Sequence, residues 1–277
     1  DVERSRGLGD VYKRQHFRKP KYDRAIVYLS RGGKDAIVSR EFDVKTKSFV
    51  KDGFTIPEAK TVALWKDDDT LFVGTNWGPN SLTKSGYPRI SKVWKRGTPL
   101  SSAETLFEAD ETAVSAYSYT VYDEGKPFYF HYVSLDFYSG KVWYDDPSGK
   151  SIEIPKPDDA EFYSLHKGQL LFALHSDFRG FKTGSLLSLS MNSLLEKGEE
   201  SLSELQVVFE PTDKRFIQGI SRTKSHIILA IADNVLGKME KTTFTPPNIW
   251  KTEPISLGEN GMALCHSCLL YTSDAAD

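Results

Sequence analysis

The stretch Thr61-Val-Ala-Leu-Trp-Lys-Asp-Asp-Asp-Thr-Leu-Phe-Val-Gly-Thr-Asn76 decides the fold class. Two runs of apolar and β-branched residues, 61–66 and 70–76, flank the polar tetrad Lys66-Asp-Asp-Asp69. Short runs of this composition predict strands, and a compact polar segment between them predicts a hairpin turn. The tetrad lacks the alternating ligands and the closing glutamate of a calcium loop, so we interpret it as a solvated turn.

The same unit, a polar turn followed by a strongly apolar strand, recurs along the chain. Such strands start at residues 25, 70, 128, 169 and 226, at intervals of 45, 58, 41 and 57 residues. Four short strands with tight connections need roughly 40–60 residues, which is the size of one propeller blade. The sequence therefore predicts an all-β fold, a β-propeller with about five four-stranded blades. A β-sandwich also uses short strands, but the grouping in fours favours the propeller.

Two long strands and one helix are predicted within this pattern. The runs 48–56 and 127–137 are each expected to be continuous strands. The interval Met191–Glu200 is the only helix-like segment, and we expect a loop insertion with at most one or two helical turns.

Composition excludes two classes of partner. The 277 residues carry a net charge of −2 with both signs interspersed, whereas a nucleic-acid-binding face is strongly basic. The longest apolar runs, 170–174 and 227–232, are far shorter than a membrane span. We therefore expect no nucleic-acid partner and no association with a membrane.

The two ends of the chain resemble translated sequencing-adapter DNA. Asp10-Val-Tyr-Lys-Arg-Gln15 and Cys268-Leu-Leu-Tyr-Thr-Ser273 can be encoded by reverse-complementary DNA. Our hypothesis is that residues 1–15 and 268–277 derive from adapters and that residues 16–267 are a partial propeller domain. The motif Cys265-His-Ser-Cys268, which otherwise suggests a redox pair or half a zinc site, would then span an artificial junction.

Motifs of hydrolases and cofactor-binding enzymes are absent from the sequence. It contains no Gly-x-Ser-x-Gly elbow, P-loop, Rossmann glycine pattern or His-Glu-x-x-His helix. We expect no catalytic residue, no cofactor and no metal site in this chain. The histidines in the strand regions (His131, His166, His175 and His226) are expected to be packed or at a solvent edge.

Two alternative functions remain open from the residues alone. Asp43, Asp136 and Asp177 would line the channel of a stand-alone, five-bladed carbohydrate-active propeller, if two of them were spaced as a glycosidase acid and base. Turn or strand-end roles are favoured for all three. A protein-interaction propeller is the other alternative.

One tryptophan is set apart from the others. Trp65, Trp94, Trp143 and Trp250 occupy predicted strands, where packing between blades is expected. Trp77 instead lies in the long loop 75–89, and long loops with Gly, Pro and aromatic residues often carry recognition.

Several short motifs, in order, resemble one peptidase family. They are Ser30-Arg-Gly-Gly-Lys-Asp35, Arg40-Glu-Phe-Asp43, Phe49-Val-Lys-Asp-Gly-Phe54, Pro57-Glu-Ala-Lys60, Ser85-Gly-Tyr-Pro-Arg89, Val93-Trp-Lys-Arg-Gly-Thr-Pro-Leu100 and Phe209-Glu-Pro211. Together they are similar to the N-terminal β-propeller of bacterial prolyl oligopeptidase-like (S9-type) serine peptidases. The resemblance is strong over residues 22–110 and looser to about 257.

The resemblance implies a seven-bladed propeller that covers an α/β-hydrolase domain and admits only short, unfolded peptides. The C-terminal hydrolase domain, which would supply the Ser-Asp-His triad, is missing here, so the fragment is expected to be inactive although its parent would be a peptidase. By position in the family, the loop residues Trp77, Tyr87 and Arg89 are expected to gate the substrate. A bacterial parent, either cytoplasmic or periplasmic, is implied.

One residue departs from the family pattern. Lys60 falls about where prolyl oligopeptidases have an aromatic residue that helps line the substrate site. The departure leaves strict specificity for proline open.

Overall fold

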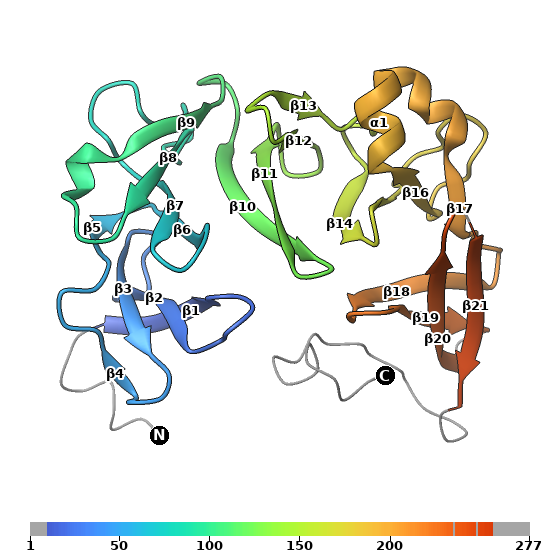
Figure 1. The fold of residues 1–277 in the computed structure, drawn as a ribbon, viewed down its shortest axis with the longest axis horizontal. Helices are drawn as coiled ribbons and strands as arrows, with labels where there is room; N and C mark the ends of the chain where they lie inside the picture. The colour runs from blue at the N-terminus through green and yellow to red at the C-terminus, as the bar shows by residue number, and fades with distance from the viewer. Residues whose placement is uncertain (1–9, 235, 248, 257–277) are drawn as a thin grey trace. The chain divides into compact units, whose positions relative to one another are not determined.

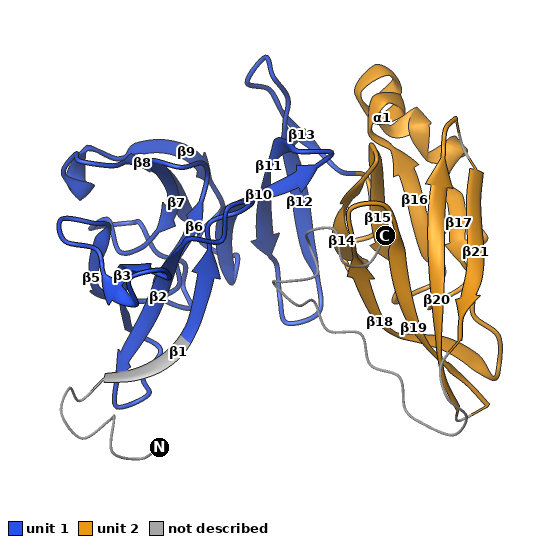
Figure 2. Ribbon diagram, turned by 60° about the horizontal axis from the view of Figure 1, so that its bottom comes forward, with its two compact units in different colours: residues 1–154 blue, residues 155–277 orange. Residues whose placement is uncertain are grey.

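The computed structural model describes residues 10–256, except Val235 and Asn248. β-Strands are the predominant secondary structure of this part (Figure 1). The chain divides into two compact units, residues 1–154 (unit 1) and 155–277 (unit 2), which Figure 2 distinguishes by colour. Cys265 and Cys268 lie outside the described residues, as does the expected junction between them.

Unit 1 contains three antiparallel sheets, each formed by strands in chain order. The first consists of β1 (Asp10–Phe17), β2 (Arg24–Arg31), β3 (Ile37–Asp43) and an outer strand in two pieces, β4 (Ser48–Phe49) and β5 (Thr55–Ala59). The second consists of β6 (Val62–Trp65), β7 (Thr70–Gly74), β8 (Ile90–Lys95) and β9 (Glu104–Glu108), with the short 3₁₀ turn η2 (Leu100–Ser102) before β9. The third consists of β10 (Ser115–Asp123), β11 (Lys126–Ser134), β12 (Gly140–Asp145) and β13 (Ser151–Glu153).

Unit 2 contains two four-stranded sheets of the same kind. They are formed by β14 (Glu161–His166), β15 (Gln169–Ala173), β16 (Leu186–Ser190) and β17 (Gln206–Phe209), and by β18 (Arg215–Arg222), β19 (Ile227–Asp233), β20 (Leu236–Thr245) and β21 (Ile249–Ile255). The helix α1 (Met191–Lys197) and the 3₁₀ segment η3 (Gly198–Glu204) are inserted before β17. Among the residues that the structure describes, five sheets with four strand positions each confirm the predicted blades. The seven-residue helix α1 is about two turns long, as expected, but η3 continues the helical segment by another seven residues.

Apolar clusters join neighbouring sheets within each unit. In unit 1, Phe54 from the first sheet meets Trp65 and Trp94 of the second in edge-to-face contacts, with ring centroids 5.8 and 4.9 Å apart. Phe107 of the second sheet packs near Trp143 of the third. In unit 2, the Trp250 indole N–H donates to Ser188 Oγ at 2.8 Å, so that it joins β21 to β16. The four strand tryptophans thus pack between sheets, as predicted.

The continuous strand expected over residues 48–56 is divided. Val50 N–H donates to Glu41 O, and Phe54 N–H donates to the buried carboxylate of Glu41 at 3.1 Å. Asp52 between them has a left-handed φ of 55°, which ends strand geometry. The chain therefore bends around Glu41 before it pairs again with β3.

The strand expected over residues 127–137 ends at Ser134 instead. The Asp136 carboxylate accepts hydrogen bonds from Tyr138 N–H and Ser139 N–H, each at 2.7 Å. An aspartate that bonds to the backbone two and three residues ahead builds a turn. Phe137 and Tyr138 therefore lie in this turn, 93% and 87% exposed, and not in a strand.

The strand β1 was not among the predicted strands. It pairs with β2, from Asp10 opposite Arg31 to Phe17 opposite Ala25. Part of it lies within residues 1–15, whose derivation from an adapter remains a hypothesis about the DNA.

Candidate functional site

The loop of residues 75–89 lies at one end of the sheets of unit 1. In each sheet the connection between the second and third strands lies at the end opposite to the first hairpin turn, because the strands are antiparallel. Tyr87 Oη donates to Asp35 of the β2–β3 connection at 3.3 Å, and Thr83 Oγ1 donates to Val114 O just before β10 at 3.0 Å. We call this end, with residues 32–36, 75–89 and 135–139, the loop end of unit 1.

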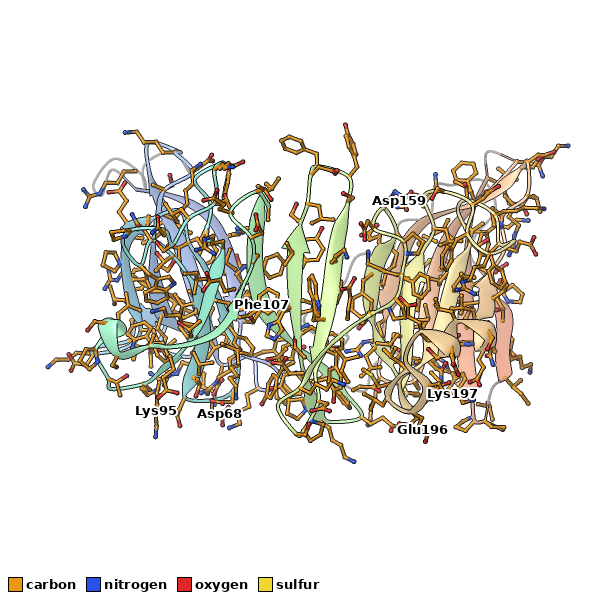
Figure 3. All side chains as sticks on the ribbon, turned by 90° about the horizontal axis from the view of Figure 1, so that it is seen from above. Asp68, Lys95, Phe107, Asp159, Glu196 and Lys197 are labelled. Atoms are coloured by element: carbon orange, nitrogen blue, oxygen red, sulfur yellow. The ribbon has the colours of Figure 1, made fainter. Side chains whose placement is uncertain are left out.

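The opposite end carries the first hairpin turns. Arg18, in the β1–β2 turn, donates to Asp68 O at 3.1 Å, and Thr120, near the far end of β10, donates to Lys66 O at 3.1 Å. Figure 3 labels Asp68 and Lys95 at the same margin, in agreement with the pairing of Lys95 with Thr70 next to the β6–β7 turn. The tetrad 66–69 forms the predicted hairpin turn here, with Asp69 N–H bonded to Asp67 Oδ1 at 3.0 Å.

Trp77 anchors the start of the loop. Its indole N–H donates to Ile90 O at 3.2 Å, and its ring packs against the cluster between the first two sheets. The Lys92 ammonium lies 4.7 Å from the Trp77 ring, within range of a cation–π contact. The backbone N–H of Trp77 is also fixed, because it donates to Ser81 Oγ at 2.9 Å.

Tyr87 lies near the tip of the loop and contacts Lys60, a residue that the sequence singles out separately. The Lys60 ammonium is 3.9 Å from the centre of the Tyr87 ring. The tip turns at Gly86, whose φ of 76° is left-handed and favours glycine. The Lys60–Tyr87 contact therefore joins the β5–β6 link to the loop.

Arg89 closes the base of the loop. Its guanidinium donates to Asn80 O at 2.8 Å, to Ala109 O at 2.8 Å and to the Glu108 carboxylate at 2.6 Å. Only 14% of the side chain is exposed. Arg89 therefore holds the two sides of the loop to the second sheet and does not project into solvent.

A cavity of about 370 Å³ opens between the loop and the β5–β6 link. It is lined by Ile56, Pro57, Glu58, Ala59, Lys60, Thr75, Asn76, Leu82, Gly86 and Leu100. Apolar side chains form much of the wall, with Glu58, Lys60, Thr75 and Asn76 as the polar residues. A cavity of this size and composition is typical of a small binding site. The loop was a candidate from its sequence, but its partners Ile56 and Leu100 were not, because they are distant in the chain.

Of the three predicted gating residues, none contacts another directly through a bond described here. Each instead fixes a different part of the loop: Trp77 the start, Tyr87 the tip and Arg89 the base. The sequence singled out this loop as a candidate, and the contacts that fix it were not visible in the sequence.

The three carboxylates of the carbohydrate-active alternative all form local turns. Asp43 accepts from the N–H groups of Thr46 and Lys45, Asp136 from those of Tyr138 and Ser139, and Asp177 from Thr183. These backbone hydrogen bonds lower the pKa of each carboxyl group. A glycosidase general acid needs a raised pKa instead. Asp43 and Asp136 moreover lie at opposite ends of their sheets.

A Ser–His–Asp arrangement is present, but it is buried. Ser118 Oγ lies 2.7 Å from His131 Nδ1, and His131 Nε2 lies 2.7 Å from Asp145 Oδ2. Ser118 and His131 are each 1% exposed, and Ser118 also donates to Ser91 Oγ at 2.7 Å. A nucleophile must reach its substrate, and these side chains cannot. We therefore interpret this series of hydrogen bonds as a structural link between the second and third sheets.

The other predicted histidines are also accounted for. His166 is 1% exposed, His226 is bonded to Thr243 Oγ1 at 2.9 Å, and His175 is exposed at a strand end. Within the described ranges, no group of three or more His, Cys, Asp or Glu side chains could hold a metal ion. No helix in that part is long and apolar enough to cross a membrane.

Comparisons with known proteins give a consistent family. The family model described as "Prolyl oligopeptidase, N-terminal beta-propeller domain" matches residues 12–263. The uncharacterized peptidase y4nA of Sinorhizobium fredii is 31% identical over 251 residues, which cover 87% of this chain and 34% of the relative. The uncharacterized peptidase RP174 of Rickettsia prowazekii is 30% identical and is covered to the same 34%. The chain thus spans about a third of the length of these curated relatives.

Solved structures agree with the fold. A post-proline cleaving enzyme from Rickettsia typhi superposes with a TM-score of 0.80 at 28% identity, over 93% of this chain and 40% of that one. Oligopeptidase B from Leishmania major gives 0.63 at 12% identity, over 89% of this chain and 33% of that one, which shows the shared fold alone. These matches favour the peptidase interpretation over the carbohydrate-active and protein-interaction alternatives. This chain belongs to the prolyl oligopeptidase family, within its N-terminal β-propeller domain.

Proposed function

We propose that this chain is the substrate-gating part of a serine-type oligopeptidase that acts on short peptides. The catalytic hydrolase domain would follow in the full-length parent, and the chain covers only 34–40% of its peptidase relatives. The fragment, which lacks a nucleophile elbow, would be inactive alone. Family membership supports the general role, and the loop end of unit 1 supports the gating role.

The observation that carries the gating role is the fixed loop beside a cavity. Residues 75–89 are held to the second sheet through Trp77 and Arg89 and to the residues before β10 through Thr83. A wall fixed in advance selects by size and shape, because little conformational freedom is lost when a ligand binds. We therefore propose that loop 75–89 acts as a rim that admits slender peptides and excludes bulkier chains.

The test replaces Trp77 and Tyr87 by Ala, singly and together, in the full-length parent. We expect the loop to loosen, so that kcat/KM rises for longer peptides relative to shorter ones. The measurement is kcat/KM over a series of peptides of increasing length. A proline-containing series is the first choice, since the relative from Rickettsia typhi is described as a post-proline cleaving enzyme.

Phe216→Ala provides the matched control. Phe216 is an aromatic residue in unit 2, is 52% exposed and has no part in the loop. The control should keep the wild-type dependence on length. If the loop variants also keep it, the gating role of loop 75–89 is wrong.

A further inference from the structure

The cavity at the loop end is lined by one lysine, Lys60. The Lys60 ammonium lines the cavity and lies 3.9 Å from the Tyr87 ring. Among the described residues, no carboxylate lies within ion-pair distance of it, although such pairs hold Arg89 and Lys84 nearby. A cation over an aromatic ring is stabilised only modestly, so its capacity to bind an anion is largely unused.

Nearby acidic groups have other contacts. Asp35 accepts a hydrogen bond from Tyr87 Oη at 3.3 Å. Glu58 also lines the cavity, but its carboxylate is 4.0 Å from the Arg31 guanidinium, and 37% of its side chain is exposed. Solvent and Arg31 both weaken its field at Lys60.

The remaining walls suit the carbon skeleton of a peptide side chain. Ile56 is 1% exposed, and Leu82 and Leu100 are half-buried around the opening. In a partly enclosed space, a hydrogen bond between an ammonium and a carboxylate is stronger than one between neutral groups. The cavity thus combines an apolar wall with one well-placed donor.

From these contacts we infer that the cavity binds a carboxylate of the peptide substrate, with Lys60 as its partner. The inference rests on the proposed gating function, because a bound peptide must pass the loop end. The carboxylate comes either from an acidic side chain or from the peptide C-terminus. Lys60 is a specificity residue here and takes no part in bond cleavage.

The experiment measures kcat/KM for the full-length parent and its Lys60→Met variant. The substrates form a four-member set: one peptide with Glu or Gln at a single position, each with a free or an amidated C-terminus. We expect Lys60→Met to lower kcat/KM about tenfold for the carboxylate-bearing members, through KM, and to leave the Gln-amide unchanged. Dependence on Glu assigns a side chain, and dependence on amidation assigns the C-terminus.

Two further variants make the result specific. Lys60→Arg keeps the charge and should retain most of the preference. Lys182→Met removes an exposed cation of unit 2 that is paired with Glu210 at 3.5 Å, and it should behave as wild type. If wild type and Lys60→Met discriminate equally within the peptide set, the inference is overturned. The gating proposal would still stand if the Trp77 and Tyr87 variants alter length selection.

Discussion

At the scale of single residues, Glu41 is a buried carboxylate in unit 1 that needs hydrogen-bond partners to offset its loss of solvent. Its side chain is fully buried, and its carboxylate receives two hydrogen bonds from the Arg96 guanidinium, at 2.7 and 3.0 Å. Arg96 also bonds to Asp69 at 2.9 Å and lies over the Phe54 ring. Glu41 and Arg96 are 55 residues apart, so the network ties the first sheet to the second.

We expect Arg96→Met to destabilise the chain by about 3–5 kcal/mol, because it removes both guanidinium hydrogen bonds from a buried carboxylate, which keeps only the Phe54 N–H and the more distant Arg24. The measurement is the free energy of unfolding in urea, followed by tryptophan fluorescence. Lys84→Met is the matched control, since its ion pair with Glu111 is exposed, and should cost less than about 1 kcal/mol. A similar cost for both variants would mean that the Glu41 network is energetically unimportant.

Residue identity alone predicted the packing of the strand tryptophans but not this network. Trp65 and Trp94 occur in apolar runs, where large aromatic side chains are expected to be buried in the core. Glu41 occurs in an ordinary polar pattern, Arg40-Glu-Phe-Asp43, and nothing nearby marks it as buried. Its burial depends on a partner from another sheet, which only the folded chain reveals.

At the scale of elements, the sequence predicted the positions of the strands more accurately than the residues at which they end. The existence of each strand in sheets two to five followed from apolar runs between turn residues. The ends at Phe49 and Ser134 are set near side chains, Glu41 and Asp136, that bond to the backbone. Leu135 and Phe137 continue the apolar pattern past Ser134, so hydrophobicity could not show that end, whereas the polar segment 51–53 was a visible turn signal after β4.

The third sheet depends on the chain of hydrogen bonds through His131. The chain connects β8, β10, β11 and β12, and the Phe107 ring stacks on the imidazole at 4.4 Å. Burial alone would raise the pKa of Asp145, but the hydrogen bond and charge of His131 outweigh it and the net pKa is lowered. His131 therefore links Ser118 to Asp145, which are also hydrogen-bonded to Ser91 and Ser151 respectively.

We expect His131→Ala to lower the free energy of unfolding by about 2–4 kcal/mol, since it leaves a cavity and removes one hydrogen-bond partner each from Ser118 and Asp145. His175→Ala is the control at an exposed position and should change stability by less than about 0.5 kcal/mol. Both are measured by urea denaturation. Equal free energies of unfolding for the two variants would contradict a stabilising role for the His131 hydrogen bonds.

At the scale of the whole molecule, the spacing of the apolar strands predicted the fold, and the resemblance of the short motifs predicted the family. The regular recurrence of apolar strands predicted blades, and the ordered motifs over residues 22–110 indicated which propeller family they form. Loop 75–89 was located by its length and composition, but the cavity beside it was not. Its walls come from residues 56–60, 75, 76, 82, 86 and 100, which only the packing of two sheets brings together.

The central claim is that this propeller restricts a peptidase to short chains. The most direct measurement presents one cleavage site to the full-length parent in two forms, as a short peptide and within a long unfolded polypeptide, and compares kcat/KM. We predict efficient cleavage of the short peptide and cleavage near background for the long chain, because the rim at the loop end excludes it. Equal kcat/KM for the two forms would contradict the account.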